Sequence, residues 1–109
     1  MSTKRTYWDN GQLRYSYNYK NDQLHGLCKW WYIDGQLRFE ENYKDGKCHG
    51  LCRNWHLNGQ LGFKSNYKDG KLNGLHRYWN ESGELEYVDF YQEGIKIEFD
   101  GFLVIWDKE

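Results

Sequence analysis

Apolar and polar residues alternate with a period of two along much of the chain. In residues 13–20, Leu13, Tyr15, Tyr17 and Tyr19 occupy one set of positions and polar residues occupy the other. This alternation is typical of a strand with one buried face, so these four residues are expected to share a face of a sheet. A second kind of strand is predicted at Leu27–Tyr32, Leu51–His56 and Leu75–Asn80. No window shows a helical period with caps.

The alternating segments recur with a step of 24 residues. The positions that keep this step are Gly11, Gly35, Gly59 and Gly83; Gly26, Gly50 and Gly74; Leu13, Leu37, Leu61 and Leu85; Tyr19, Tyr43, Tyr67 and Tyr91; and Trp31, Trp55 and Trp79, with Tyr7 in the equivalent first position. More than half of the positions are identical between residues 31–54 and 55–78. The sequence therefore predicts a repeat protein, in which each unit mainly contacts its neighbours.

Each unit carries two turn signals. The first is an Asn-Gly, Asp-Gly or Ser-Gly pair that ends at Gly11 and its equivalents. The second is Asp45-Gly46 and its equivalents, which the first unit replaces by Asn21-Asp22. Such pairs predict β-hairpins with type I′ turns, in which both central residues have positive φ. The expected fold class is all-β: an elongated, single, twisted antiparallel sheet of repeated β-hairpins.

One β-hairpin repeat domain is predicted over residues 1–109, with units at 7–30, 31–54, 55–78 and 79–94. The last unit has Glu98 in place of the second glycine and continues around Asp100-Gly101. We expect residues 95–109 to form a capping hairpin, because terminal repeats must close an open stack. The alternative is a surface for dimerisation by edge pairing.

Composition favours a thin domain stabilised by rings. Aromatic residues make up 19% of the chain, and each large ring can bury roughly 150–250 Å², so rings can replace a thick aliphatic core. The three cysteines, Cys28, Cys48 and Cys52, are an odd number, and residues 1–7 contain no apolar stretch typical of a leader. We therefore expect reduced thiols and a cytoplasmic location. The net charge of −1 argues against nucleic-acid binding.

The unit Trp-Tyr-x-Asp/Asn-Gly-Gln-Leu-x-Phe-x-x-Asn-Tyr-Lys-Asp-Gly-Lys-x-x-Gly resembles the bacterial variant of the MORN repeat, from Tyr7 to Gly94. The resemblance implies sheets of β-hairpins that bind proteins, or in some cases membrane phospholipids. Proteins of this type are often labelled antitoxins. The aromatic stretches at residues 29–32 and 77–79 are also similar to choline-binding repeats, which lack the Lys-Asp-Gly-Lys turn.

Positions that every unit keeps and positions that vary suggest different roles. The kept series, represented by Leu13, Tyr15, Tyr19, Leu27 and Trp31, is expected to form the packed face. Variable positions are not required by every unit, so they are candidates for recognition, and Trp and Tyr are enriched at binding hot spots. The predicted partner-binding residues are Trp30, Tyr32, His56, Tyr78, Tyr17 and Asn54. Alternatively, these rings close the ends and edges of a thin core.

Catalytic and metal-binding chemistry is not expected. Cys28, Cys52 and His76 share one repeat position, but equivalent residues two strands apart lie roughly 10 Å from each other. One zinc ion cannot bridge that distance. The histidines lack H-E-x-x-H spacing, and the Lys-Asp-Gly-Lys turns lack the P-loop and EF-hand patterns. We therefore expect no enzyme, no cofactor and no metal.

The predicted function is a non-catalytic protein-binding repeat module. Its sharpest version is an antitoxin or immunity-type inhibitor that binds a toxin or effector through a variable aromatic face. Two alternatives stay open: a peripheral membrane or phospholipid-binding module, which the balanced charge disfavours, and a choline- or sugar-binding aromatic module. The expected partner is a protein and not a nucleic acid, and a homodimer through the free sheet edges is also compatible with this fold.

Overall fold

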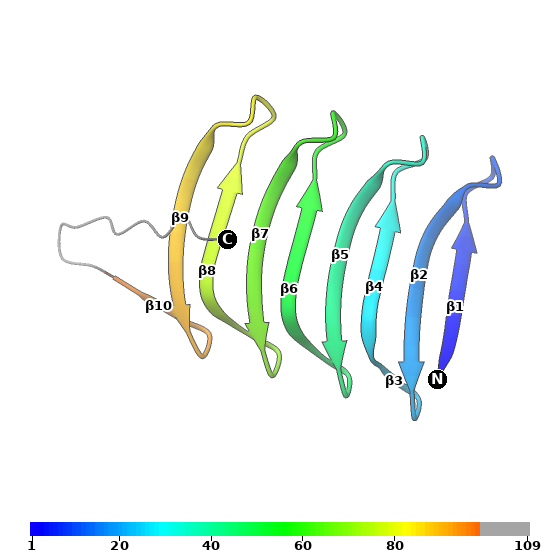
Figure 1. The fold of residues 1–109 in the computed structure, drawn as a ribbon, viewed down its shortest axis with the longest axis horizontal. Helices are drawn as coiled ribbons and strands as arrows, with labels where there is room; N and C mark the ends of the chain where they lie inside the picture. The colour runs from blue at the N-terminus through cyan, green and yellow to red at the C-terminus, as the bar shows by residue number, and fades with distance from the viewer. Residues whose placement is uncertain (99–109) are drawn as a thin grey trace.

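Residues 1–98 are described by a computed structural model, and they form one antiparallel sheet without helices (Figure 1). The strands are β1 (Ser2–Tyr7), β2 (Leu13–Lys20), β3 (Gln23–Leu24), β4 (Gly26–Trp31), β5 (Leu37–Lys44), β6 (Lys47–Trp55), β7 (Leu61–Lys68), β8 (Lys71–Trp79), β9 (Leu85–Gln92) and β10 (Ile95–Ile97). Their order in the sheet is β1-β2-β4-β5-β6-β7-β8-β9-β10, with the short β3 paired to β2. The predicted sheet of successive hairpins is confirmed.

The last described strand, β10, covers only one end of β9. Its register pairs Ile95 with Gln92 and Ile97 with Phe90. Within the described residues, the part of β9 from Leu85 to Asp89 therefore has a strand neighbour on one side only, which is β8. The capping hairpin predicted for residues 95–109 lies outside the described residues from Phe99 onward.

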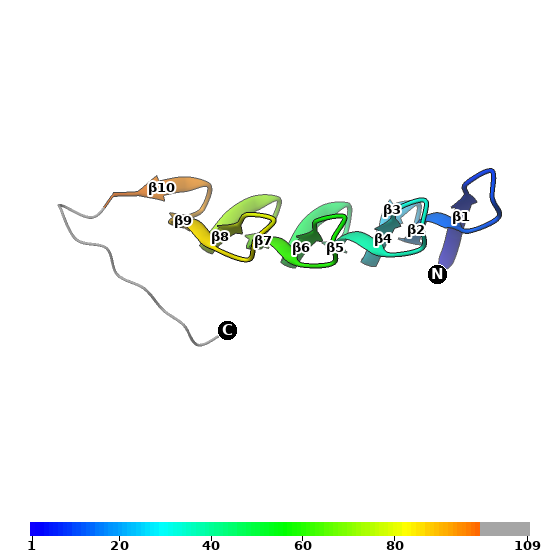
Figure 2. The ribbon, with the colours of Figure 1, turned by 90° about the horizontal axis from the view of Figure 1, so that it is seen from above.

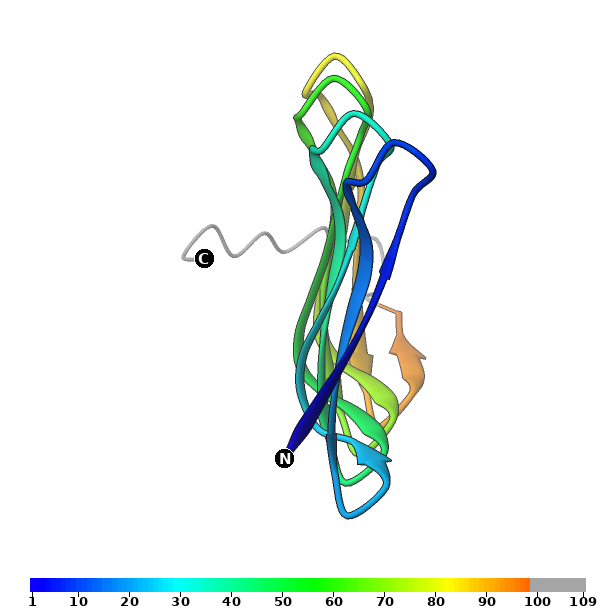
Figure 3. The same cartoon turned by 90° about the vertical axis from the view of Figure 1, so that its right-hand side faces the viewer.

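The sheet is a single layer, and no second layer of described residues covers either face. Figure 2 shows the strands in one row, and Figure 3 shows them fanned by the twist of the sheet. Burial is consequently shallow. The buried hydrophobic side chains are those of Cys28, Cys52 and Leu75, at 2%, 4% and 8% exposure. Most rings are half-buried, because they pack against their neighbours within one face.

The turns at the lower edge of the sheet in Figure 1 are of the predicted type I′. Both central residues have positive φ, with 49° at Asp45 and 84° at Gly46, and the same holds at Asp69-Gly70 and Glu93-Gly94. In the first unit Asn21 and Asp22 adopt φ values of 51° and 62°. Short polar side chains tolerate this region better than most others, which explains why Asn-Asp can replace Asp-Gly here.

The upper turns differ from the prediction. Gly11 has positive φ but Asn10 does not, and the Gly11 N–H donates to the carbonyl oxygen of Trp8 at 2.9 Å. This geometry is a three-residue loop, a turn followed by a glycine in the left-handed region, and not a two-residue type I′ turn. The loop is accompanied by one bulged residue in the strand that follows it: Arg14, Arg38, Gly62 and Glu86 have no partner in the register.

The bulge changes which residues share a face. Tyr15 pairs with Thr6 but Leu13 pairs with Tyr7, so the register shifts between the two residues. Leu13, Leu27 and Trp31 line one hollow together with polar residues of the intervening positions, whereas Tyr15 faces Trp30 on the other side. The prediction that Leu13, Tyr15, Tyr19, Leu27 and Trp31 form a single packed face is therefore wrong, because the kept residues are divided between both faces.

Hydrogen bonds also join each unit to the next outside the strands. At the lower edge, the N–H groups of Gly46, Gly70 and Gly94 each donate to a carbonyl oxygen of the preceding unit at 2.8 Å. At the upper edge, the Asn10 and Asn58 amides donate to the carbonyl oxygens of Ile33 and Glu81 at 2.9 and 2.7 Å. Each turn is therefore held by its neighbour, as expected when units are stable only in a stack.

Candidate partner-binding face

One face of the sheet carries a row of rings. Tyr15, Trp30 and Phe39 are direct partners in successive strands, and the row continues through Asn54 and Phe63 to Tyr78 and Tyr87. Directly paired residues of antiparallel strands project to the same side. We call this side the ring face and the other the opposite face.

Ring contacts run from β2 to β9, with His76 between Phe63 and Tyr87. Trp30 lies 5.5 Å from Tyr15 and 5.8 Å from Phe39, measured between ring centroids. Phe39 reaches past Asn54 to Phe63 at 5.6 Å. In the last units Tyr78 stacks on Tyr87 at 5.5 Å. Tilted and edge-to-face pairs at these distances are favourable for aromatic rings, so the row stabilises the sheet without a covering layer.

A second, more polar row runs beside the rings on the same face. Its members are Cys28, Glu41, Cys52, Ser65, His76 and Asp89, paired across β4 to β9. Ser65 is 1% exposed and its hydroxyl bonds Nδ1 of His76. Burial lowers the pKa of His76 from its usual 6.5, so the ring is neutral near pH 7. Burial raises the pKa of the Cys52 thiol to about 12. This row therefore supplies neither a cation nor a reactive thiolate.

Four of the six predicted partner-binding residues lie in the central part of the ring face. The Trp30 Nε1–H donates to the Tyr17 hydroxyl at 3.1 Å, which fixes both rings. Asn54 accepts a 2.8 Å hydrogen bond from the Phe63 N–H through its side-chain oxygen. Tyr78 belongs to the ring row itself. These side chains are half-buried and have contacts of their own, and their role in recognition stays a prediction.

Tyr32 and His56, the other two, lie at the upper margin of the sheet and bond the next unit. The Tyr32 hydroxyl donates to the carbonyl oxygen of Trp55 at 2.7 Å, and His56 Nε2 lies 2.8 Å from the carbonyl oxygen of Trp79. Trp8, at the same repeat position, donates to Trp31 at 3.2 Å. The residue type at this position varies while the hydrogen bond is kept. The premise that variable positions have no part in the fold is therefore wrong here.

Two arginines, Arg14 and Arg38, also belong to this face. The Arg14 guanidinium lies 4.7 Å from the Trp8 ring and 5.2 Å from the Tyr15 ring, and that of Arg38 lies 5.4 Å from the Tyr32 ring. They line a hollow of about 190 Å³ together with Trp8, Tyr15, Trp30 and Trp31. Strict alternation placed Arg14 on the opposite side, and only the bulge brings it to the rings.

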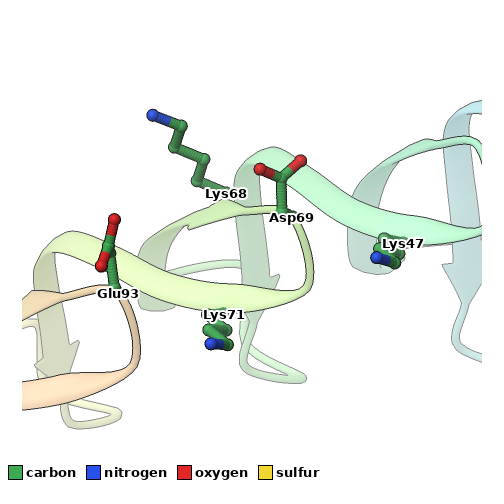
Figure 4. A pocket seen from close by; sticks show the side chains of 5 residues that line it. All are labelled: Lys47, Lys68, Asp69, Lys71 and Glu93. Atoms are coloured by element: carbon green, nitrogen blue, oxygen red, sulfur yellow. The ribbon is translucent and has the colours of Figure 1, made fainter.

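A second hollow, of about 320 Å³, lies along the lower turns (Figure 4). Its lining residues are Lys47, Lys68, Asp69, Lys71 and Glu93. Figure 4 shows that these side chains do not converge on one point, since Lys68, Asp69 and Glu93 extend away from Lys47 and Lys71. The lining side chains carry charges of both signs, and we interpret this hollow as a solvent-exposed edge of the sheet. No group of His, Cys, Asp or Glu in residues 1–98 is arranged to hold a metal ion.

The opposite face is lined by leucines, indoles and charged side chains. Glu40, at 8% exposure, forms an ion pair with Arg53, and the row continues through Lys64 to Arg77. The Arg53 guanidinium also lies 5.2 Å from the Trp55 ring. The Glu40 carboxylate and the Trp55 ring thus already contact one cation of this row, Arg53. No helix of the described residues is long and apolar enough to cross a membrane.

Comparison with known families agrees with this architecture. The family model described as MORN repeat variant matches residues 3–21, 24–45 and 49–69, which together make up more than half of the chain. The chain therefore belongs to the MORN repeat family, in its variant form. Repeats of this family are non-catalytic modules associated with the binding of proteins or of membrane phospholipids. Neither the curated proteins nor the solved structures contain a significant match to this chain.

Proposed function

We propose that this protein is a non-catalytic module that binds a partner protein through its ring face. The observation that carries the proposal is the row of partly exposed rings from Tyr15 to Tyr87, which contains one non-aromatic residue, Asn54, and which no other described segment covers. Neighbouring contacts already hold these rings in place, so a partner would cover them at little further cost in side-chain entropy. Large, ordered aromatic side chains are the residues that dominate binding energies at protein interfaces.

The hollow beside Trp30 suggests the chemistry of the contact. Arg14 and Arg38 are exposed, and both guanidinium groups lie over rings at the N-terminal end of the ring face. Arginine can stack on a ring and still donate to a carboxylate, because its donors lie in the guanidinium plane. An acidic side chain of the partner is therefore the group that this hollow would accept.

The finer version of the proposal is that the partner is a toxin or effector in the cytoplasm, whose active site the ring face covers. This version rests on the resemblance to bacterial MORN-variant proteins that are labelled antitoxins. The membrane alternative has weaker support in the charges of the chain. The cations of the opposite face share their row with Glu40, and the net charge is −1. Attraction to an anionic membrane needs a surplus of exposed cations.

A pull-down from the cells that produce the protein tests the proposal. The variants are Trp30→Ala with Tyr78→Ala, which removes ring area, and Arg14→Glu with Arg38→Glu, which reverses charge at exposed positions. The matched control is Lys20→Glu with Lys44→Glu, which makes the same charge change at the exposed lower edge.

We expect one protein to co-purify with the wild type and with the control, and to be lost by about tenfold or more with either ring-face pair. Circular dichroism checks that each variant is folded. Equal recovery with the folded arginine variant would contradict the acidic contact. Retention on anionic vesicles, with no protein recovered, would favour the membrane alternative.

A further inference from the structure

Among the described residues, the outer side of β9 is paired along only part of its length. In the interior, β8 pairs with β7 from Phe63 to Lys68, with Phe63 opposite Tyr78 and Ser65 opposite His76. β9 is the equivalent of β7, but β10 pairs only with its residues 90–92. Leu85 and Tyr87 are consequently 43% and 47% exposed. Their equivalents in β7, Leu61 and Phe63, are only half-exposed or less. The outer edge of β9 at residues 85–89, which we call its open part, has no strand partner among residues 1–98 and presents backbone groups beside apolar side chains.

At the other end of the sheet, β1 is a strand of the kind that would pair with the open part of β9. β1 runs in the same direction as β4, β6 and β8 (Figure 1), and its Tyr7 stands at the repeat position of Trp31. β1 therefore corresponds to the second strand of a unit. Its inner edge pairs with β2, and its outer edge has no partner among the described residues. Among the described residues, the outer edge of β1 thus corresponds to an edge that pairs with a first strand inside the chain, and the outer edge of β9 to one that pairs with a second strand.

We propose that β1 of one copy pairs with the open part of β9 of a second copy, so that the sheet continues from chain to chain. The 24-residue step fixes the register. It places Thr6 opposite Tyr87, Arg5 opposite Val88 and Lys4 opposite Asp89, as Tyr78, Arg77 and His76 lie opposite Phe63, Lys64 and Ser65 within the chain. β1 and β9 run in opposite directions, so the pairing is antiparallel like every other pairing in the sheet.

The charges of the two edges favour the pairing of β1 of a second copy with β9. β1 carries Lys4 and Arg5, whereas β9 carries Glu86 and Asp89. Opposite charges directly across an antiparallel pair stabilise it, and like charges destabilise it. Asp89 already attracts a cation, since Lys96 Nζ lies 3.3 Å from its carboxylate. A second copy therefore brings a cation, Lys4, opposite the carboxylate of Asp89.

The assembly that follows is head-to-tail. The two contacting edges differ, so the interface is heterologous, and each added copy leaves the same two edges free. Because the added strand keeps the register of the repeats, the ring face of one copy would continue into that of the next. The inference concerns self-association, and it does not depend on the identity of the partner proposed above.

Sedimentation velocity over a range of concentrations at low salt tests the inference. The full chain has a mass of 13.3 kDa, and we expect its weight-average mass to rise above this value with concentration and to fall when salt is added. Lys4→Glu and Asp89→Lys should each raise the concentration needed for association by about tenfold or more. Lys44→Glu, the same charge change at an exposed interior turn, should leave association unchanged.

Mixing the two variants gives the sharpest outcome. The Lys4→Glu chain keeps Asp89 and the Asp89→Lys chain keeps Lys4, so a mixture should recover association that neither chain shows alone. A wild type that stays at 13.3 kDa up to millimolar concentration overturns the proposal, and is the result expected if residues 99–109 cover the edge instead. A folded Lys4→Glu variant that associates like the wild type overturns it as well.

Discussion

The imidazole of His56 contacts the backbone carbonyl oxygen of Trp79 through Nε2 at 2.8 Å, and so ties one repeat to the next. The Tyr32 hydroxyl makes the same connection to Trp55 one unit earlier. An imidazole in its Nε2–H form and a phenol have little in common except an N–H or O–H at the right reach. The upper edge of the sheet therefore requires a donor at this position and not a particular amino acid.

Removal of this donor should destabilise the stack without a change in ring packing. His56→Phe keeps a ring beside Tyr78, which lies 5.9 Å away, but leaves the Trp79 carbonyl oxygen without its partner. We expect the free energy of unfolding to fall by about 1 kcal/mol. Urea unfolding followed by circular dichroism measures the change.

The matched control is His56→Tyr, which restores a donor of the kind that Tyr32 supplies. This variant should recover most of the lost stability. Equal midpoints for the Phe and Tyr variants would show that the hydrogen bond contributes nothing, and that only the ring matters at this position.

The turn of the first unit offers a stabilising change. Asp22 adopts a φ of 62°, whereas the other units have glycine at this position, as at Gly46. The left-handed region costs an ordinary residue about 1–2 kcal/mol, less for Asp, and glycine nothing. We expect Asp22→Gly to raise the free energy of unfolding by about 0.5 kcal/mol, after the greater entropy of glycine in the unfolded chain is subtracted.

Gly46→Ala is the reverse experiment, measured in the same urea titration. A Cβ at Gly46 would meet the Gln23 side chain at ordinary contact distances of 3.6 Å or more. Any loss of stability therefore reports backbone strain, and we expect about 1 kcal/mol. If Asp22→Gly destabilises the protein instead, the Asp22 side chain has a role that its backbone conformation does not reveal.

The repeat pattern predicted the sheet because the same local signals recur in each unit. Asp45-Gly46 and its equivalents specify a two-residue turn, and the step of 24 residues specifies two strands per unit. The upper turns were harder to predict, because an Asn-Gly pair is compatible both with a type I′ turn and with a three-residue loop that ends in a left-handed glycine. The difference of one residue moves Leu13 to the opposite face and Arg14 to the ring face.

The candidate site was predictable only in part, for a related reason. The repeat position that Trp30 and Tyr78 share predicts that they lie in one row. The kept rings at Phe39 and Phe63 were expected on the packed face, and only the register shows that they are direct neighbours of Trp30 and Tyr78. Tyr32 and His56 are different residue types, and their shared function as donors becomes visible only when the carbonyl of the next unit is placed beside them. Variation between repeats shows that a position tolerates more than one residue type. It does not show that the position has no structural role.

The three thiols should differ in reactivity. Cys28 and Cys52 are buried, whereas Cys48 is partly exposed and lies 3.5 Å from a Glu41 carboxylate oxygen. Burial raises the pKa of all three thiols, and the nearby Glu41 carboxylate raises the pKa of Cys48 further. In the folded protein at pH 8 we expect the Cys48 thiol to react with an aromatic disulfide reagent about tenfold or more faster than the two buried thiols, because it is the partly exposed one.

Cys48→Ser identifies the reactive group in this assay. The variant should lose the faster phase, and in urea its two remaining thiols should both react quickly. Two fast thiols in the folded wild type would mean that the sheet opens locally around Cys28 or Cys52.

Stability should decrease in mild acid because of His76. Its pKa in the folded protein is lowered by burial, below the 6.5 of an ordinary histidine, although Asp89 opposes this shift. The unfolded chain therefore binds a proton at a higher pH than the folded chain does. As the pH falls through the unfolded value, the proton stabilises the unfolded state, and the free energy of unfolding decreases until the folded pKa is reached.

Urea midpoints between about pH 7 and about pH 5.5 measure this dependence, in a range above the titration of most carboxylates. His76→Gln removes the titrating group and should flatten the profile, while His49→Gln leaves His76 in place and should keep the slope. The hydroxyl of Ser65 bonds Nδ1 of the neutral ring. Ser65→Ala should lower the free energy of unfolding at neutral pH, because it removes this hydrogen bond. A slope that is unchanged in the folded His76→Gln variant would assign the acid sensitivity to another group.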